Sequence, residues 1–218
     1  MMKTLAAASV LAMTGAAFAQ FDLQITEIWM GNEPGSNLTE DWFEVTNFGD
    51  TAYVAATDGQ LYFDDESADF TTGDLLDIPT IAPGETVIFV DGDVVLWNDI
   101  WFTNLPAGTQ VVSYAGAGLG QGGDTINLFL DADLNGLDGA DAIIETAGYP
   151  DANFNGGQSY DVFLGAFSTV GNFAGAYQSS ISNDVGQFAV ASPGTIPTPG
   201  AVALLGLAGL AGVRRHRG

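Results

Sequence analysis

The stretch Asp41-Trp42-Phe43-Glu44-Val45-Thr46-Asn47 decides the fold class of this chain. Phe43 and Val45 alternate with Trp42, Glu44 and Thr46, the period of two expected of a strand whose successive side chains face opposite ways, so a strand is predicted over residues 42–47. Similar short runs lie on both sides of it, with Gly, Pro, Asn or Asp at the turns between them. Many short strands separated by turn signals predict an all-β domain built as a sandwich.

Outward from this stretch, the alternation of apolar and polar residues predicts further strands. They cover residues 21–26, 51–54, 61–63, 86–90, 110–114, 125–130 and 143–147, with 159–164 and 187–190 closing the sheet. One helix is expected over 93–102, because Asp93 is a favourable N-cap and Val94, Trp97 and Trp101 recur at helical spacing.

The charges of the chain are segregated. All 27 Asp and Glu lie between residues 20 and 195. Every positively charged side chain and the only histidine lie outside that range: Lys3, Arg214, Arg215, His216 and Arg217. The middle of the chain therefore has a formal side-chain charge of −27, and no internal ion pair can relieve its self-repulsion.

This inventory excludes several classes of chemistry for residues 20–195, which contain no Lys, Arg, His or Cys. Nucleophiles activated by histidine and phosphate clamps need residues that are absent. Zinc and copper sites normally need imidazole or thiolate, and nucleic-acid binding needs cationic side chains. Ca²⁺ binding and glycoside hydrolysis by carboxylates alone remain possible.

The N-terminus predicts export. Lys3 precedes an apolar stretch over residues 5–17, and the small residues Ala17 and Ala19 predict signal-peptide cleavage before Gln20. Residues 1–19 are therefore expected to be a signal peptide and residues 20–195 the mature domain. The alternative is an uncleaved anchor helix, which is less favoured because the stretch is short for a bilayer span and no stop-transfer pattern follows it.

The C-terminus, residues 196–218, predicts a membrane-sorting tail. Pro197 and Pro199 end the preceding structure, and residues 200–213 contain no charged or polar side chain. Fourteen helical residues span about 21 Å, which is less than the bilayer core of about 30 Å. Three arginines then close the chain and favour a cytoplasmic end: Arg214, Arg215 and Arg217.

This order of proline motif, short apolar helix and terminal arginines resembles the PEP-CTERM sorting signal of bacterial exported proteins. The resemblance implies processing by an exosortase-type membrane enzyme near Pro197-Thr198-Pro199. The chain has Pro-Thr-Pro where that signal has Pro-Glu-Pro, which leaves the identity of the processing enzyme open.

Five short motifs in the middle of the chain belong together: Ile25-Thr26-Glu27-Ile28, residues 41–47, Ile81-Ala82-Pro83-Gly84-Glu85, residues 122–128 and Ser192-Pro193-Gly194. In this order they resemble the lamin-tail domain, which implies an immunoglobulin-like β-sandwich. The similarity extends over residues 22–194, and the segment 131–161 departs from it as a candidate insertion.

Asp131-Ala132-Asp133-Leu134-Asn135-Gly136 matches the opening half of a calcium loop. Oxygen ligands stand at the first, third and fifth positions, and glycine at the sixth permits a sharp turn. The twelfth position, which should carry a bidentate acid, is Ala142, with Asp141 one place early. We predict a possible Ca²⁺ site from Asp131, Asp133, Asn135 and Asp141. The alternative is an acidic hairpin connection.

Other motifs favour structural interpretations. Residues 118–123 spell G-x-G-x-x-G, but a strand follows where a nucleotide site needs a helix, so a glycine-rich turn is expected. The acidic stretch 64–77 is interpreted as a solvated loop rather than an ion site. Glu27 and Glu44 are candidates for a catalytic carboxylate pair, but strand residues with a structural role are favoured.

The four tryptophans are expected to pack in the core rather than to line a sugar platform. They are Trp29, Trp42, Trp97 and Trp101.

The sequence thus predicts a non-enzymatic exported protein of the cell surface or extracellular matrix. Its expected partners are the cell envelope or extracellular polysaccharide and protein, with the membrane contacted through the tail before processing and no nucleic acid. One alternative is a Ca²⁺-dependent carbohydrate-binding module. A weaker alternative is a glycoside hydrolase that uses carboxylates alone.

Overall fold

The structure is a computed structural model that describes residues 20–31, 38, 40–101, 104–153, 155–171 and 175–195. The expected signal peptide and sorting tail, including Ala17, Ala19, Pro197, Pro199 and the arginines, lie outside the described residues. Within the described part of the chain, no helix is long and apolar enough to cross a membrane.

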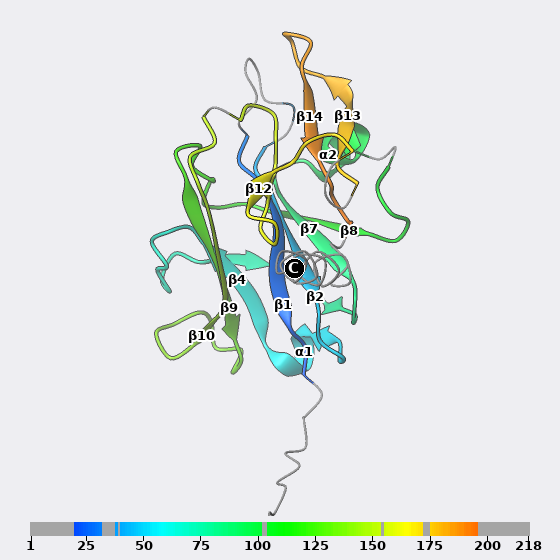
Figure 1. Cartoon of the computed structure of the whole chain (residues 1–218). Coiled ribbons are helices and arrows are strands. Elements are labelled where there is room, and N and C mark those ends of the chain that lie inside the picture. The colour runs from blue at the N-terminus through cyan, green and yellow to red at the C-terminus, as the bar shows by residue number, and fades with distance from the viewer. Residues whose placement is uncertain are drawn as a thin grey trace, which may run out of the picture.

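The protein is all-β, with two main sheets (Figure 1). The larger sheet has the strand order β12-β11-β1-β2-β7-β8, and all of its neighbours are antiparallel except the parallel pair β7 and β8. Its strands are β1 (Leu23–Trp29), β2 (Trp42–Asn47), β7 (Thr86–Asp91), β8 (Gln110–Tyr114), β11 (Tyr160–Asp161) and β12 (Ala166–Phe167).

The second sheet is antiparallel, with the order β10-β9-β4-β5. Its strands are β4 (Gln60–Asp64), β5 (Asp74–Leu76), β9 (Asp124–Asp131) and β10 (Ala142–Tyr149). Two small sheets complete the strands, β3 (Tyr53–Val54) with β6 (Thr80–Ile81), and β13 (Tyr177–Ser182) with β14 (Phe188–Ala191). The helices among the described residues are α1 (Ala55–Asp58) and α2 (Val94–Trp101).

The main core lies between the inner faces of the two large sheets. Phe43 of β2 packs against Phe89 of the same sheet and against Phe63 of β4, with ring centroids 5.4 and 5.0 Å apart. Leu128 of β9 closes this cluster from the second sheet. Burial of such apolar surface is the main favourable contribution to folding.

A second core lies on the other face of the larger sheet, under α2 and the β13–β14 hairpin. It is built around the four tryptophans, each of which is fully buried. The rings of Trp29 and Trp42 stack with their centroids 6.2 Å apart, and Trp97 and Trp101 of α2 meet Trp42 edge-on. The prediction that the tryptophans are core residues is confirmed, and β2 is consequently buried on both faces.

The helix predicted after Asp93 is confirmed. The Asp93 carboxylate accepts the Val95 N–H at 2.8 Å and the Leu96 N–H at 3.3 Å, which caps the start of α2. The described helix ends at Trp101, one residue before the predicted end.

One expectation about the later part of the chain is wrong. Residues 187–190 do not close a main sheet, because β14 pairs with β13 in a separate hairpin. The segment 131–161, the candidate insertion, contributes β10 to the second sheet and β11 to the larger sheet.

The acidic stretch 64–77 is more ordered than the solvated loop that was predicted. Asp64 is 3% exposed, and its carboxylate accepts the Ser67 hydroxyl and the Asp69 N–H. Asp74 belongs to β5, and its carboxylate accepts the Ala117 N–H at 2.8 Å. Carboxylates that accept backbone N–H groups fix the turns of this region.

Candidate functional site

The candidate metal site lies in the hairpin loop that joins β9 to β10. Asp131 is the last residue of β9 and Asp141 directly precedes β10, whose first residue, Ala142, is the Cα partner of Leu130. Closure of the hairpin therefore brings Asp131 and Asp141 together, although they are ten positions apart in the sequence. Asp133 stands two residues into the loop.

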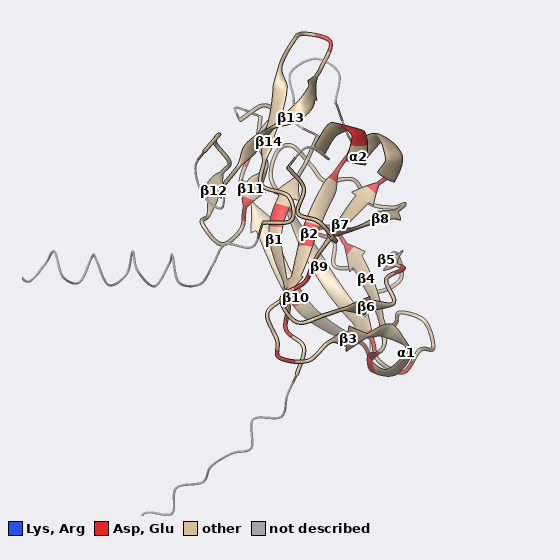
Figure 2. Ribbon diagram, turned by 90° about the vertical axis from the view of Figure 1, so that its right-hand side faces the viewer, with Lys and Arg blue, Asp and Glu red and all other residues tan. Residues whose placement is uncertain are grey.

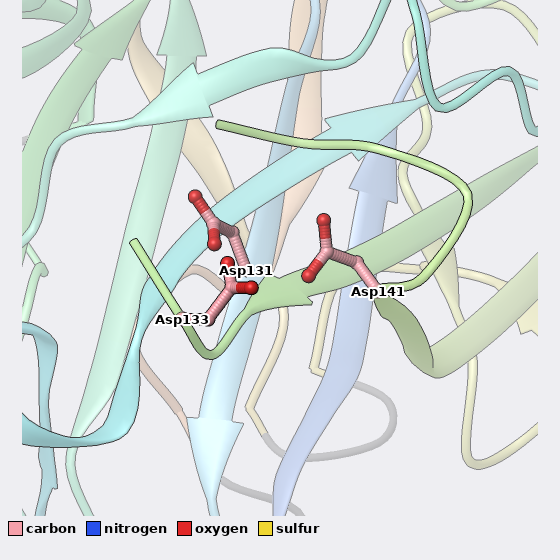
Figure 3. Close-up of side chains that lie close together, drawn as sticks. All are labelled: Asp131, Asp133 and Asp141. Atoms are coloured by element: carbon pink, nitrogen blue, oxygen red, sulfur yellow. The ribbon is translucent and has the colours of Figure 1, made fainter. Parts of the chain in front are cut away.

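Asp131, Asp133 and Asp141 converge on one space (Figure 3). Each carboxylate offers an oxygen such that the three atoms lie within 4.8 Å of one another. Asp131 is buried, Asp141 half-buried and Asp133 exposed, so the site opens to solvent on the Asp133 side. The structure thus brings together all three acids that the sequence predicted as ligands.

The fourth predicted ligand, Asn135, lies beside this group. Its backbone N–H and its side-chain amide donate to the two oxygens of Asp133, at 3.3 and 2.9 Å. Gly136 adopts φ +99°, in the region that glycine favours, and its N–H donates to Asp131 Oδ2 at 2.9 Å. The glycine in the sixth position therefore turns the chain back over the first ligand.

The two oxygens of Asp131 differ. Oδ2 accepts the Gly136 N–H, whereas Oδ1 is buried and has no hydrogen-bond partner. A buried carboxylate oxygen without a partner carries a desolvation cost. No Lys or Arg belongs to the described part of the chain, so no side-chain cation there can offset that cost (Figure 2).

The missing acid at the twelfth position does not prevent convergence. Asp141 stands one place early in the sequence, yet its carboxylate joins the group, and its Oδ2 accepts the Asp138 N–H at 2.7 Å. The alternative interpretation, an acidic hairpin connection, accounts for this hydrogen bond and for those of Asp133. It does not explain why the buried Asp131 Oδ1 has no hydrogen-bond partner.

Two residues near the loop were missed by sequence reasoning. Gly59, with φ +115°, faces the end of β9 so closely that a Cβ would lie 2.4 Å from the Asp131 carbonyl oxygen. Tyr62 of β4 has a raised pKa because of burial and then because of the negative charges of Asp131 and Asp141. Both belong to the neighbouring strand region, and only the pairing of β4 with β9 places them here.

A second acidic group lies in the larger sheet. Glu27 of β1 and Glu44 of β2 are Cα partners, and they are 2% and 1% exposed. Burial raises the pKa of Glu27 to about 7, against the opposing effect of hydrogen bonds from Ser159 and Ser192. The pKa of Glu44 is well above its usual range because of burial and then because of the charge of Glu27.

The Glu27–Glu44 pair is covered by residues 192–194, which follow β14. Glu27 Oε1 accepts the Ser159 hydroxyl and the Ser192 N–H, the latter at 2.8 Å. Glu44 accepts the Thr26 hydroxyl on one oxygen and the Gly194 N–H on the other. Both carboxyls are thus enclosed by protein groups rather than presented to solvent. This agrees with the interpretation of Glu27 and Glu44 as strand residues with a structural role.

The glycine-rich stretch 118–123 forms a turn, as predicted. The Gly123 N–H donates to the Gly120 carbonyl oxygen at 3.3 Å, and the strand β9 follows at Asp124. A nucleotide site would require a helix N-terminus at this point.

Comparison of the chain with family models, with curated proteins and with solved structures finds no match.

Proposed function

We propose that the chain is an exported, non-enzymatic protein of the cell surface or extracellular matrix that acts as a structural or interaction module. In this proposal residues 20–195 form a lamin-tail-like, immunoglobulin-like sandwich, and residues 196–218 sort the protein through an exosortase-type system. The segregation of charge carries the proposal: every Lys, Arg and His belongs to one of the two expected signals.

The charge distribution supports a non-catalytic domain. Processing at both ends would leave a body with 27 acidic residues and no cationic, imidazole or thiol side chain. Most catalytic mechanisms need at least one such group as nucleophile, base or charge stabiliser. The all-β architecture agrees with the proposed sandwich but does not by itself assign a function.

The β13–β14 hairpin supports an interaction role. It extends from the body of the molecule beyond the two main sheets (Figures 1 and 2). Ile181 and Val185 on this hairpin are 47% and 59% exposed, and Phe188 is 43% exposed. Exposed apolar side chains gathered on one projecting element are typical of contact surfaces.

The two alternatives receive less support. A glycosidase needs two carboxyls that flank a bound sugar, whereas Glu27 and Glu44 are buried under Ser192 and Gly194. A carbohydrate-binding module finds support in the Asp131 cluster but not in the tryptophans, all of which are enclosed in the second core.

The mass of the protein recovered from its native envelope tests the proposal. We expect an N-terminus at Gln20 and a C-terminus near Pro199, with the protein in the envelope or extracellular fraction. A chain that retains residues 1–19 and stays in the cytoplasm would overturn the proposal of export. An exported protein that still carries Arg217 would overturn processing alone and indicate a standing anchor.

A further inference from the structure

We propose that the β9–β10 loop binds one Ca²⁺ ion through the carboxylates of Asp131, Asp133 and Asp141, with the Asn135 side-chain oxygen as a fourth ligand. The proposal does not depend on export or on the proposed module function, because it is drawn from the loop itself. It names a metal site, its ligands and the ion that it selects.

The first argument is the convergence of three carboxylates from different parts of the hairpin. Their oxygens lie within 4.8 Å of one another although like charges repel. In most proteins a Lys or Arg relieves such a group, but the described part of this chain contains none. A bound cation would balance these charges at one point of the loop.

The second argument is independent of the clustering and concerns a single atom. Asp131 is 1% exposed, and its Oδ1 has no hydrogen-bond donor while Oδ2 is held by the Gly136 N–H. Buried polar atoms are almost always satisfied, by protein, by water or by an ion. An oxygen that is buried, negatively charged and adjacent to two further carboxylates is suited to a metal ion.

The chemistry of the ligands selects the ion. Carboxylate and amide oxygens suit hard cations, and zinc or copper would require imidazole or thiolate. The loop has the oxygen-ligand spacing and the glycine turn of a calcium loop, as seen at Asp131, Asp133, Asn135 and Gly136. Because the group is irregular and open on the Asp133 side, it fits the flexible coordination of Ca²⁺ better than the octahedral demand of Mg²⁺.

The test uses the full-length chain, purified in a mild detergent and freed of metal with a chelator. Calorimetric titration with CaCl₂ should show one site with a dissociation constant of about 0.1 to 1 mM, the range of extracellular calcium modules. In about 10 mM CaCl₂ the thermal midpoint should rise by roughly 3 to 10 °C. An equal concentration of MgCl₂ should give less than half of this rise.

Two variants separate specific binding from general screening of an acidic protein. Asp131→Asn removes the buried charge and should weaken binding at least about tenfold, because calcium affinity depends on the number of charged ligands. Asp138→Asn removes one side-chain charge from the same loop but keeps the backbone N–H that Asp141 accepts and a side-chain oxygen for the Ala140 N–H, so it should bind as the unmodified chain does.

The thermal stability of the metal-free variants shows whether a loss of calcium binding is due to a lost ligand or to unfolding. Without calcium, Asp131→Asn should melt no lower than the unmodified chain, because it removes a buried charge that has an unpaired oxygen. Equal responses to CaCl₂ and MgCl₂, or equal loss of binding in Asp131→Asn and Asp138→Asn, would show screening only and overturn the proposal. The absence of any calcium response would overturn it as well.

Discussion

Glu27 and Glu44 lie directly opposite each other on β1 and β2, and both carboxyls are buried beneath the segment that ends the domain. Two carboxylates enclosed at such close range cannot both ionise without a large cost. The pair therefore holds at least one proton at a pH where exposed carboxyls have lost theirs. This arrangement makes the stability of the domain dependent on pH in an unusual range.

We expect the free energy of unfolding to fall between pH 5 and pH 8. The pKa of Glu27 is about 7 in the folded protein against 4.5 for an ordinary glutamate, so the folded state binds more protons than the unfolded chain between these values. The stabilisation is complete below about pH 4.5 and is lost as the pH rises through 7. Glu27 alone would account for roughly 3 kcal/mol.

Urea unfolding at pH 5 and pH 8, at one ionic strength and with chelator present, measures this dependence. Exposed carboxyls are already ionised at pH 5, so their mutual repulsion changes little over the interval. Stability that is constant or increasing from pH 5 to pH 8 would contradict the assignment of a shared buried proton.

Glu27→Gln should stabilise the protein at pH 8 and reduce its dependence on pH. The amide keeps an oxygen that can accept the Ser192 N–H and Ser159 hydroxyl, while the buried charge is removed. We expect a gain of about 1 to 3 kcal/mol at pH 8 and little change at pH 5. Glu40→Gln is the control, since it removes the same charge from an exposed side chain. An equal effect of both substitutions would mean that net charge, not burial, is responsible.

Gly59→Ala should damage both the fold and the calcium loop. Its φ of +115° disfavours any side chain, and a Cβ would lie 2.4 Å from the Asp131 carbonyl oxygen and 2.7 Å from the Ala132 Cα. We expect a loss of about 2 to 4 kcal/mol in urea unfolding and weaker calcium binding. Gly139→Ala, in the loop itself, has open space around its Cβ and should change neither. Similar losses of stability and of calcium binding in the two variants would contradict the importance of the close approach between Gly59 and the Asp131 backbone.

Trp42→Phe should cost much less stability than Trp42→Ala. The Trp42 ring contacts Trp29, Trp97 and Trp101, and its indole N–H has no hydrogen-bond partner. Phenylalanine therefore loses ring volume but no hydrogen bond, whereas alanine leaves a large cavity that costs about 3 to 5 kcal/mol. If phenylalanine proves as costly as alanine in denaturant unfolding, the indole nitrogen must have a partner such as a buried water.

The double variant Ile181→Ser/Val185→Ser should leave stability within about 0.5 kcal/mol of the unmodified chain, because both side chains are largely exposed. If the β13–β14 hairpin is a contact surface, salt washing of native envelopes should release this variant more readily. Leu75→Ser is the control, since Leu75 is 43% exposed on β5, the edge strand of the second sheet. Equal retention of all three proteins would exclude the hairpin as the contact.

Local patterns predicted the regular elements of this protein well where alternation was strong. The strands β2 and β8 begin and end at the predicted residues, and Asp93 caps α2 as expected. Short strands such as β5 and β12 were not predicted, because two or three residues carry no periodicity. Their strand geometry comes from pairing with β4 and β11, the strands that directly precede them in the chain.

The bulge in β1 shows why strand alternation alone misplaces side chains. The register with β2 shifts between Ile25 and Glu27, so the consecutive residues Thr26 and Glu27 both engage the Glu44 side of the sheet. Strict alternation would have separated them. The shift therefore allows Glu44 to have Glu27 as its Cα partner and also to accept the hydroxyl of Thr26.

The sequence by itself determined the composition of residues 20–195, the order of oxygen-bearing residues at Asp131, Asp133 and Asn135, and the β character of the chain. These depend on local spacing and on residue type. The tertiary structure decided that Asp141 joins Asp131, that Asp131 Oδ1 is left without a partner, and that Glu27 meets Glu44 under Ser192. Each of these facts depends on burial and on strand pairing. Strand pairing brings together segments that are far apart in the sequence, and local sequence patterns do not predict which segments will pair.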